Sequence, residues 1–520
     1  MRIKLPMEKT EPMFCAESAA ASIAKWMNHH YELMFVDMLG FDFDYEAALK
    51  DGVMGKNLTI GFTVRQILDN LEKYHGIKVK ATFVNSENVI SFLKECIDRN
   101  MPIGMSYSEE YCDWTNGTEE SYLLLYGYEE EHFLCYDMHT YEKIEWALSF
   151  KNMVDFVQSM KEARCETYYL EREERKDVSV DTIIERINEC RYCTDEMLEK
   201  RLQMADYIEH QIDIQREVKG YEDIVFNAPL FLNITHILRG RKLLASSFEY
   251  IYNITRDRSA LECSFVFNKF GNRWKKIWSR LQITYFRYTD SKSVPCKKKL
   301  KSISDELRVL VNEEYQYVMD LCNHRIDGNN NFIMISESED LAGSQINELD
   351  ISGYLNNRAF ARSIENKEQA DISGCGEYFY IGDLSDTITV NVYNQPVSIE
   401  LFKEGGDNIS CQEQTIEVDA AKCKKILFVG CAEWGEVVEK VTLTFENGKE
   451  IEVICYIADW YNQFSSKCIW SGDMKDVNGE KGKRSLFGYV YDWTEEMKLT
   501  SIQLPKNKNM HIFKILLINE

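Results

Sequence analysis

The sequence lacks any long run of apolar residues, and its 61 basic residues are outnumbered by 85 acidic ones. No stretch approaches about 18 apolar residues, so no membrane-spanning helix is expected. The first residues, MRIKLPMEKTEPMF, carry no apolar core and no small-residue cleavage site, so no signal peptide is expected. The net charge of −24 argues against broad nucleic-acid binding and against an anionic membrane as the main partner. We therefore expect a cytoplasmic protein with no nucleic-acid partner and no membrane partner.

Proline is scarce, at 7 residues in 520, and no low-complexity linker or internal repeat divides the chain. A chain of this length is expected to fold into about two to four domains. The 16 cysteines are expected to be reduced and mainly buried as small hydrophobic residues. Only Cys190 and Cys193 form a CxxC pair, and without a second pair no metal site is predicted.

The pattern of apolar residues divides the chain into three parts, which predicts a multidomain α+β protein. Residues 1–172 mix helix and strand patterns, and residues 173–330 place apolar residues at helical spacing almost throughout. Residues 331–520 contain short alternating segments separated by Gly, Asn and Asp turns, which predicts an all-β sandwich. We expect an α/β domain, a helical bundle and a β-sandwich with these boundaries.

Cys15 stands directly before the small-residue run AESAAASIAKW, and the pattern predicts a helix over residues 16–28. A thiol at a helix N-terminus feels the positive end of the helix dipole, which favours the thiolate. The small side chains would let this helix press closely against a sheet. Two interpretations are open at this point: a mounted nucleophile, or a buried cysteine in the first turn of a helix.

The stretch TEESYLLLYGYEEEHFLCYD, which ends at Asp137, predicts two strands around a tight acidic turn. If the hairpin turns about Glu129, Asp137 faces Ser121 on the partner strand. His132 then lies five residues from Asp137, which is about 16 Å along a strand, and cannot pair with it. His139 lies two residues beyond Asp137 and is better placed as a base than the histidines at positions 29, 30 and 75.

Cys15 on the first helix, the Gly127-Tyr128 step and the Tyr136-Asp137 end of the hairpin together resemble the N-terminal domain of the butirosin biosynthesis protein H family. That domain is related to papain-like cysteine peptidases and to bacteriocin-processing peptidases. The resemblance covers residues 10–170, and the stretch FGNRWKKIWSRL is similar to the region that follows the domain. It implies a papain-like fold and acyl transfer from a carrier-protein thioester to an amine. It implies no metal or organic cofactor, apart from a phosphopantetheine arm on the partner.

Family members carry a histidine at the start of one strand and an aspartate on the next, and Ser121 stands here at the histidine position. The resemblance implies Cys15 as the nucleophile, Asp137 as the orienting acid and His139 as a substitute base. Papain-like enzymes place a glutamine six residues before the cysteine, where this chain has Lys9. Two hypotheses are open: a cysteine-dependent acyltransferase, or amide-forming or amide-hydrolysing enzyme, with an atypical site, and an inactive scaffold that acts as a binding partner.

A window of reversed charge lies between residues 273 and 301, where Asp290 is the only acid. Such a basic face predicts a docking surface for an acidic acyl- or peptidyl-carrier protein. The other interpretation is a solvated face whose charges pair with acidic neighbours. The basic residues of the window are Arg273, Lys275, Lys276, Arg280, Arg287, Lys292, Lys297, Lys298, Lys299 and Lys301.

The stretch NELDISGYLNNRAFARSIENKEQADISGCGEYFYIGDL, together with the later YIADWYN and IQLPKNKNMHIFKILLI, resembles galactose-binding-like, jelly-roll-type sandwich domains attached to bacterial glycoside hydrolases. The resemblance covers residues 335–520. Such domains stack sugars on exposed aromatic side chains, or serve as plain scaffolds that dock or form homo-oligomers. The available tryptophans are Trp434, Trp460, Trp470 and Trp493. The residues predicted to form turns rather than ligand contacts are Asn356, Asn357, Asp371 and Gly374.

Overall fold

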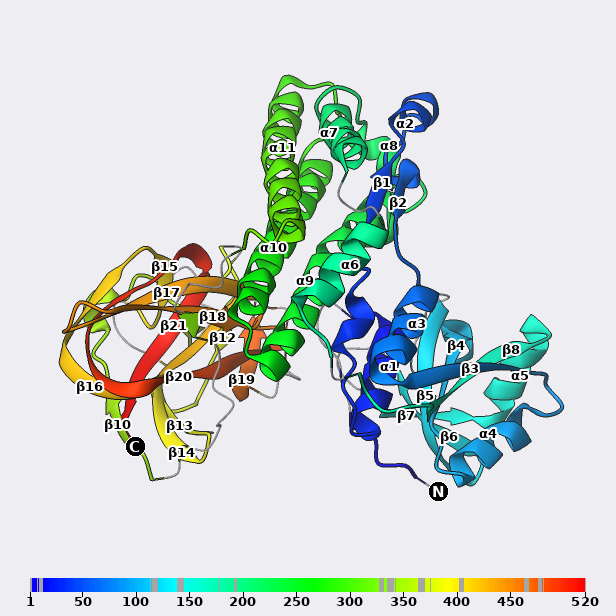
Figure 1. Cartoon of the computed structure of the whole chain (residues 1–520), viewed down its shortest axis with the longest axis horizontal. Helices are drawn as coiled ribbons and strands as arrows, with labels where there is room; N and C mark the ends of the chain where they lie inside the picture. The colour runs from blue at the N-terminus through cyan, green and yellow to red at the C-terminus, as the bar shows by residue number, and fades with distance from the viewer. Residues whose placement is uncertain are drawn as a thin grey trace. The chain divides into compact units, whose positions relative to one another are not determined.

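The computed structural model combines helices with antiparallel sheets, and contacts divide it into two compact units. Unit 1 is Met1–Asp327 and unit 2 is Gly328–Glu520 (Figure 1). None of the helices that the structure describes is both long and apolar enough to cross a membrane. The described residues are 2–6, 8, 13–112, 114, 120–137, 145–175, 177–190, 194–326, 332–333, 341, 343–362, 370–374, 376–401, 406–462, 467–475, 479 and 481–519.

Unit 1 contains a six-stranded antiparallel sheet with the strand order β3-β8-β4-β5-β6-β7. Sequence neighbours β4 to β7 pair in order, and β8 returns between β4 and β3. Four helices and the short η3 (Glu109–Tyr111) accompany the sheet. The strands are β3 (Ile77–Val84), β4 (Ile103–Ser108), β5 (Glu120–Glu129), β6 (His132–Asp137), β7 (Glu145–Ser149) and β8 (Ala163–Leu170). The helices are α1 (Cys15–Trp26), α3 (Val64–His75), α4 (Val89–Asp98) and α5 (Phe150–Met160).

The local sequence explains the first two of these helices. Four alanines of α1 are fully buried (Ala19, Ala20, Ala21 and Ala24), so the helix backbone can lie close to β5. The helix α3 begins after Thr63, whose hydroxyl accepts a hydrogen bond from the Gln66 N–H. It ends at Gly76, where φ is +72° and a side-chain Cβ would lie 2.1 Å from the Arg172 carbonyl oxygen. Glycine is therefore required at this helix end.

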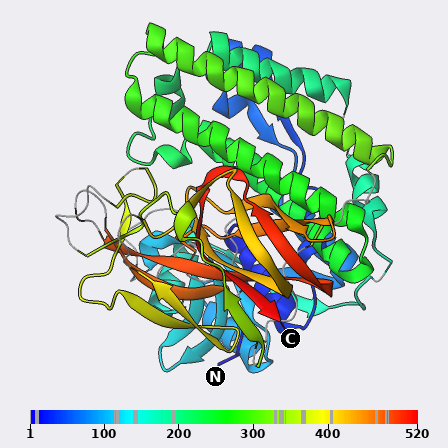
Figure 2. The same cartoon turned by 90° about the vertical axis from the view of Figure 1, so that its left-hand side faces the viewer.

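The helical part of unit 1 is built around two long antiparallel helices, α9 and α10, with α11 packed beside α10 and α7 (Figures 1 and 2). The residue pair Val294-Pro295 opens α11, so proline stands in the first helical turn, where its missing N–H costs nothing. The helices are α6 (Val180–Glu189), α7 (Asp195–His210), α8 (Ile214–Val218), α9 (Pro229–Thr255), α10 (Arg258–Arg287) and α11 (Val294–Cys322), with η4 (Val225–Asn227) before α9.

A segment between α1 and α3 completes the helical core rather than the core beneath the sheet. Its apolar side chains, among them Leu33, Phe41 and Met54, are buried with those of α9 and α10. The boundary predicted at residue 172 therefore does not separate the two hydrophobic cores. This segment contains η1 (Glu32–Phe35), β1 (Phe41–Phe43), α2 (Tyr45–Asp51), η2 (Gly55–Asn57) and β2 (Leu58–Ile60), and β1 pairs with β2.

One fully buried ion pair fixes the long helices of the bundle. Arg241 on α9 pairs with Glu314 on α11 through two hydrogen bonds, one of them 3.2 Å long from Nε to Oε2. The indole N–H of Trp274 on α10 donates to the same carboxylate at 3.0 Å. The Arg241 guanidinium holds the pKa of Glu314 below its ordinary value against the opposing effect of burial. The three helices are thus held in register by one satisfied charge cluster.

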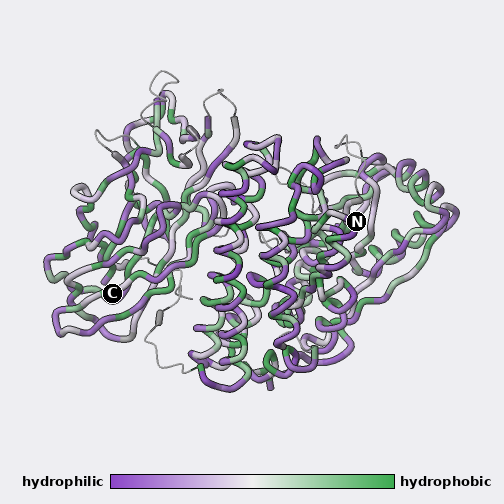
Figure 3. Tube along the Cα trace, turned by 90° about the horizontal axis from the view of Figure 1, so that it is seen from above, coloured by the Kyte–Doolittle hydropathy of each residue, from purple (hydrophilic) through white to green (hydrophobic). Residues whose placement is uncertain are grey.

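Unit 2 consists mainly of antiparallel strands, with the main order β10-β21-β16-β20-β17-β18-β9, in which β9 pairs with β18 in parallel. Alternating residues of these strands are buried in one large apolar core, and Figure 3 shows the hydrophobic and hydrophilic residues interspersed along them. Asn447-Gly448 forms the turn between β17 and β18, with φ of +76° at the glycine. The strands are β9 (Phe332–Ile333), β10 (Gln345–Glu348), β11 (Phe360–Ala361), β12 (Tyr378–Tyr380), β13 (Thr387–Val392), β14 (Gln395–Glu400), β15 (Ile409–Gln412), β16 (Thr415–Ala432), β17 (Val437–Phe445), β18 (Glu450–Ile457), β19 (Cys468–Lys475), β20 (Lys481–Gln503) and β21 (Lys506–Asn519), with η5 (Ser352–Tyr354) after β10.

Candidate functional site

Cys15 is the first residue of α1, and its side chain is half-buried. None of the 14 cysteines that the structure describes forms a disulfide, and three others are also half-buried. Cys190 caps the C-terminal end of α6 and Cys322 ends α11, so both lie at the negative end of a helix dipole. Cys468 begins the strand β19. Cys15 therefore differs from these three by its place at a positive helix end, which favours a thiolate.

Residues from α9 surround the first turn of α1. The Arg239 guanidinium lies 3.0 Å from the centre of the Phe14 ring and donates a 2.8 Å hydrogen bond to Glu17. This ion pair neutralises the one acid in the first turn, so the carboxylate does not oppose a thiolate at Cys15. Phe14 has no side-chain oxygen with which to cap the helix.

His236 on α9 also contacts this turn, and sequence reasoning did not single it out. Its ring centre lies 4.7 Å from that of Phe14 and 6.4 Å from that of Phe62. Burial, together with the nearby Arg239 cation, lowers the pKa of His236 to about 4. Its buried Nδ1 has no hydrogen-bond partner among the described residues. A neutral imidazole therefore packs against the residue that precedes Cys15.

The hairpin of β5 and β6 has a different register from the predicted one. Asp137 pairs with Leu123 rather than with Ser121, and His132 pairs with Glu129. The turn is centred on residues 130–131, and Glu130 takes the left-handed conformation with φ of +38°. An irregularity at residues 125–127 then shifts the pairing by one further residue. The prediction of a turn about Glu129 was therefore wrong.

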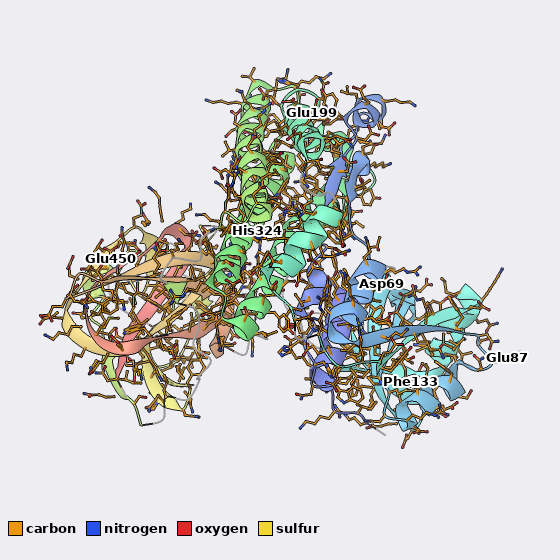
Figure 4. The ribbon with its side chains drawn as sticks, viewed as in Figure 1. Asp69, Glu87, Phe133, Glu199, His324 and Glu450 are labelled. Atoms are coloured by element: carbon orange, nitrogen blue, oxygen red, sulfur yellow. The ribbon has the colours of Figure 1, made fainter. Side chains whose placement is uncertain are left out.

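The side chains of Ser121 and Asp137 nevertheless meet, because they are diagonal neighbours on one face of the sheet. The Ser121 hydroxyl donates a 3.0 Å hydrogen bond to Asp137 Oδ1, and both side chains are buried. The indole N–H of Trp114 donates to Asp137 Oδ2 at 2.8 Å, and this indole stacks on that of Trp146 at a centroid distance of 5.0 Å. Phe133, labelled in Figure 4, lies earlier on β6 with its ring fully buried. A serine and a tryptophan thus hold the carboxylate at the end of β6.

The predicted base falls outside the part of the chain that the structure describes. His139 lies there, and so does Lys9, the residue at the expected oxyanion-stabilising position. His132 is exposed at the turn end of the hairpin. His75 is buried, with its Nδ1 2.6 Å from Glu174 Oε1 and its Nε2 accepting the Leu33 N–H at 3.1 Å. Both nitrogens of His75 are therefore used within the fold.

The basic window of α10 and α11 divides into a paired part and an unpaired part. Arg273 pairs with Glu313, and both Lys276 and Arg280 pair with Glu306. Lys301 also has a carboxylate partner, Glu209, at 3.0 Å. Lys275 lies on the same helix, α10. By contrast, Lys297 and Lys298 are exposed on the first turns of α11 and form no ion pair with any described residue. Much of the predicted docking face is thus internally neutralised.

The tryptophans of unit 2 differ sharply in exposure. Trp460 and Trp493 are buried, Trp470 is half-buried, and Trp434 is 55% exposed. Tyr461 is the other strongly exposed aromatic residue among the described residues of this unit, at 53%. Two of the predicted turn residues act as expected: Asp371 Oδ1 accepts the Gly376 N–H, and Gly374 has φ of +71°. The side-chain amide of Asn356 bonds instead to the backbone of Ser410 on β15, and that of Asn357 donates to the Asp371 carbonyl oxygen.

The backbone segments that contain Trp434 and Tyr461 are both hydrogen-bonded to the carboxylate of Asp459. Asp459 accepts hydrogen bonds from the N–H groups of Gly435 and Tyr461. Trp434 takes the left-handed conformation, with φ of +60°, which is strained for a bulky residue. Beside it, Glu433 is buried with its Oε1 3.5 Å from His511 Nε2, and its Oε2 has no partner among the described residues. Burial raises the pKa of Glu433, although the interaction with His511 opposes the shift.

No group of three or more metal-ligating side chains occurs among the residues that the structure describes. Cys190 Sγ lies 3.9 Å from Asp37, and its CxxC partner, Cys193, is outside the described residues. Comparison with protein families finds no family model that matches the chain, and comparison with curated proteins finds no match.

Proposed function

We propose that unit 1 contains a papain-like cysteine site that transfers an acyl group from a carrier-protein thioester to an amine, in the assembly of a peptide-like natural product. The resemblance to the butirosin protein H family is the source of this reaction class. Cys15 would be the nucleophile and Asp137 the orienting acid. The β-strands of unit 2 would form a galactose-binding-like, jelly-roll-type sandwich.

The reaction would occur in two displacements at one sulfur atom. The thiolate of Cys15 attacks the thioester carbonyl, the carbon–sulfur bond to the phosphopantetheine arm breaks, and its sulfur leaves as a thiolate that takes up a proton. The amine nitrogen then attacks the acyl group on Cys15. The second carbon–sulfur bond breaks, the nitrogen loses its proton to a base, and the Cys15 thiolate returns. His139 is the proposed base.

The single observation that supports this proposal best is the hydrogen bond from Ser121 to Asp137. It joins the two strand positions at which the resembled family has its histidine and aspartate, although Asp137 and Ser121 are not direct pairing partners. In the proposed site this buried carboxylate would be the orienting acid, with serine in place of imidazole. Cys15 at the start of a helix that packs against β5 supplies the thiol.

Mass spectrometry of the protein after incubation with short acyl thioesters tests the proposal. We expect one acyl group on the peptide that contains Cys15, and no adduct in Cys15→Ala. Cys322→Ala is the matched control, because Cys322 is also half-buried but lies at a helix C-terminus. Acylation that is spread equally over both cysteines, or absent with every thioester, would contradict the proposal.

The second candidate function is a non-catalytic binding partner, and the Ser121 hydroxyl favours it because serine cannot serve as a base at neutral pH. In this case unit 2 would supply a glycan-binding surface at Trp434. The exposed indole could stack on a sugar ring. Titration with soluble mono- and oligosaccharides should show tryptophan fluorescence changes that Trp434→Ala abolishes and Leu384→Ala, at another exposed apolar residue, retains. Saccharide responses that persist in Trp434→Ala would reject this site.

A further inference from the structure

Exposed apolar side chains gather at one end of the helical bundle. This bundle tip comprises the end of α10, the turn of residues 288–293, the start of α11 and the adjoining η4 segment. Phe286 is 66% exposed and Val294 is 80% exposed. Phe226 stacks on Trp278, two turns before Phe286 on α10, which ties η4 to the same end. The exposed apolar residues of the tip are Ile224, Phe226, Ile283, Phe286 and Val294.

Basic residues without carboxylate partners surround these side chains. Arg273, Lys276 and Arg280 lie earlier on α10 and each pairs with a glutamate. At the tip the pairing stops: five cations form no ion pair with any residue that the structure describes. They are Arg287, Lys292, Lys297, Lys298 and Lys299.

The tip is locally positive in spite of the acidic chain. From Arg287 to Lys299 the tip has five cations and one acid, Asp290. Its other acids are Asp213, which accepts a 3.0 Å hydrogen bond from Ser291, and Glu222 and Asp223, which precede Ile224. Burial lowers the pKa of Lys299, and Arg280 and Arg287 lower it further, as expected where positive charges crowd together. Since charges beyond about 8 Å are largely screened at physiological ionic strength, the tip can attract anions that the rest of the chain repels.

We propose that the bundle tip binds the surface of an anionic phospholipid membrane, with Phe286 and Val294 inserted among the lipids and the lysines on the headgroup phosphates. Four of the five unpaired cations are lysines. Lysine is depleted at protein–protein interfaces, but its long flexible side chain can place a point charge on a lipid phosphate. Apolar side chains at helix ends, flanked by basic residues, are the chemistry of a peripheral membrane contact. This contact is independent of the reaction proposed at Cys15.

Vesicle flotation of the full chain tests this inference, with phosphatidylcholine vesicles that contain or lack phosphatidylserine. Wild-type protein should float only with phosphatidylserine, and less as salt is added. Lys297→Gln/Lys298→Gln should weaken binding by about 25-fold, at about fivefold for each charge. Phe286→Ser/Val294→Ser should weaken it by about tenfold or more.

Matched controls exist on the sheet half of unit 1. Lys80→Gln/Lys151→Gln removes two exposed lysines, as the Lys297/Lys298 variant does. Phe83→Ser/Val64→Ser removes a phenylalanine about as exposed as Phe286 and a valine that begins a helix, as Val294 does. Both controls should bind as the wild type does. Absent wild-type flotation, or an equal loss in tip variants and controls, would overturn the proposal. A third outcome is that immobilised polyglutamate captures the wild type and the controls but not the tip variants, while none of the proteins binds vesicles. That result would overturn the proposal of a lipid partner and assign the tip to an acidic protein.

Discussion

Protonation of His236 should weaken unit 1 at mildly acidic pH. Its pKa is about 4 in the folded chain, because burial and the Arg239 cation disfavour the charged ring, whereas an unfolded histidine has a pKa of about 6.5. The unfolded state therefore takes up a proton first, so stability is fully present above about pH 6.5 and is lost as the pH falls toward 4. This linkage lowers the free energy of unfolding by about 2 kcal/mol between about pH 7.5 and pH 5. The loss reaches about 3 kcal/mol once His236 is protonated in the folded state as well.

The substitution His236→Leu should remove this acid sensitivity, because leucine keeps an apolar contact with Phe14 and Phe62 but binds no proton. Peptide-resolved hydrogen exchange on α9 gives the opening free energy at the two pH values. The drop on acidification should be about 2 kcal/mol smaller in the variant than in the wild type. His132→Leu, at an exposed histidine, should leave the drop unchanged. Equal acid sensitivity in wild type and His236→Leu would refute a buried neutral imidazole at this position.

Three further substitutions test the buried polar contacts of unit 1. Glu314→Gln leaves Arg241 buried without a carboxylate and should lower the free energy of unfolding, measured with urea, by about 3–5 kcal/mol. A decrease of less than about 1 kcal/mol would contradict a tight ion pair. Ser121→Ala removes one donor to Asp137 and should cost about 1–3 kcal/mol in the same assay, and no cost would mean that the bond is weak. Ser121→His should speed the alkylation of Cys15 by iodoacetamide at neutral pH, and an unchanged rate would mean that the hairpin is not aligned with this thiol.

Elements whose signals are local could be predicted from the sequence. The sequence alone predicts a helix around residues 150–160 and an earlier helix closed by Gly76, and the structure has α5 over Phe150–Met160 and the end of α3 just before Gly76. Caps, glycine stops and apolar periodicity act within a few residues, so a single sequence contains them. The strands of unit 2 around Asn447-Gly448 follow from the same kind of signal.

Features that depend on distant packing could not be predicted in this way. The hairpin register depends on the left-handed Glu130 and on the irregularity at residues 125–127, which no local alternation records. The residues from Leu33 to Leu58 are apolar enough to be buried, but their spacing does not say which core takes them.

The candidate site follows the same division between local and distant information. Cys15 was found from the small residues that follow it, and the contact between Ser121 and Asp137 was expected although its register was not. The bond from Trp114 to Asp137 and the contact of His236 with Phe14 join segments far apart in the chain. No motif marks either of them, so only the folded structure brings these groups together.

Single-turnover transfer from Cys15 tests the central claim most directly. Protein first acylated by a thioester and freed of excess donor would be mixed with an amine, and the acyl group followed by mass spectrometry. We expect the amine to speed the loss of the Cys15 adduct while an equal amount of the acyl amide appears. An adduct that never forms, or one that decays to free acid at a rate independent of the amine, would contradict acyl transfer through this thiol.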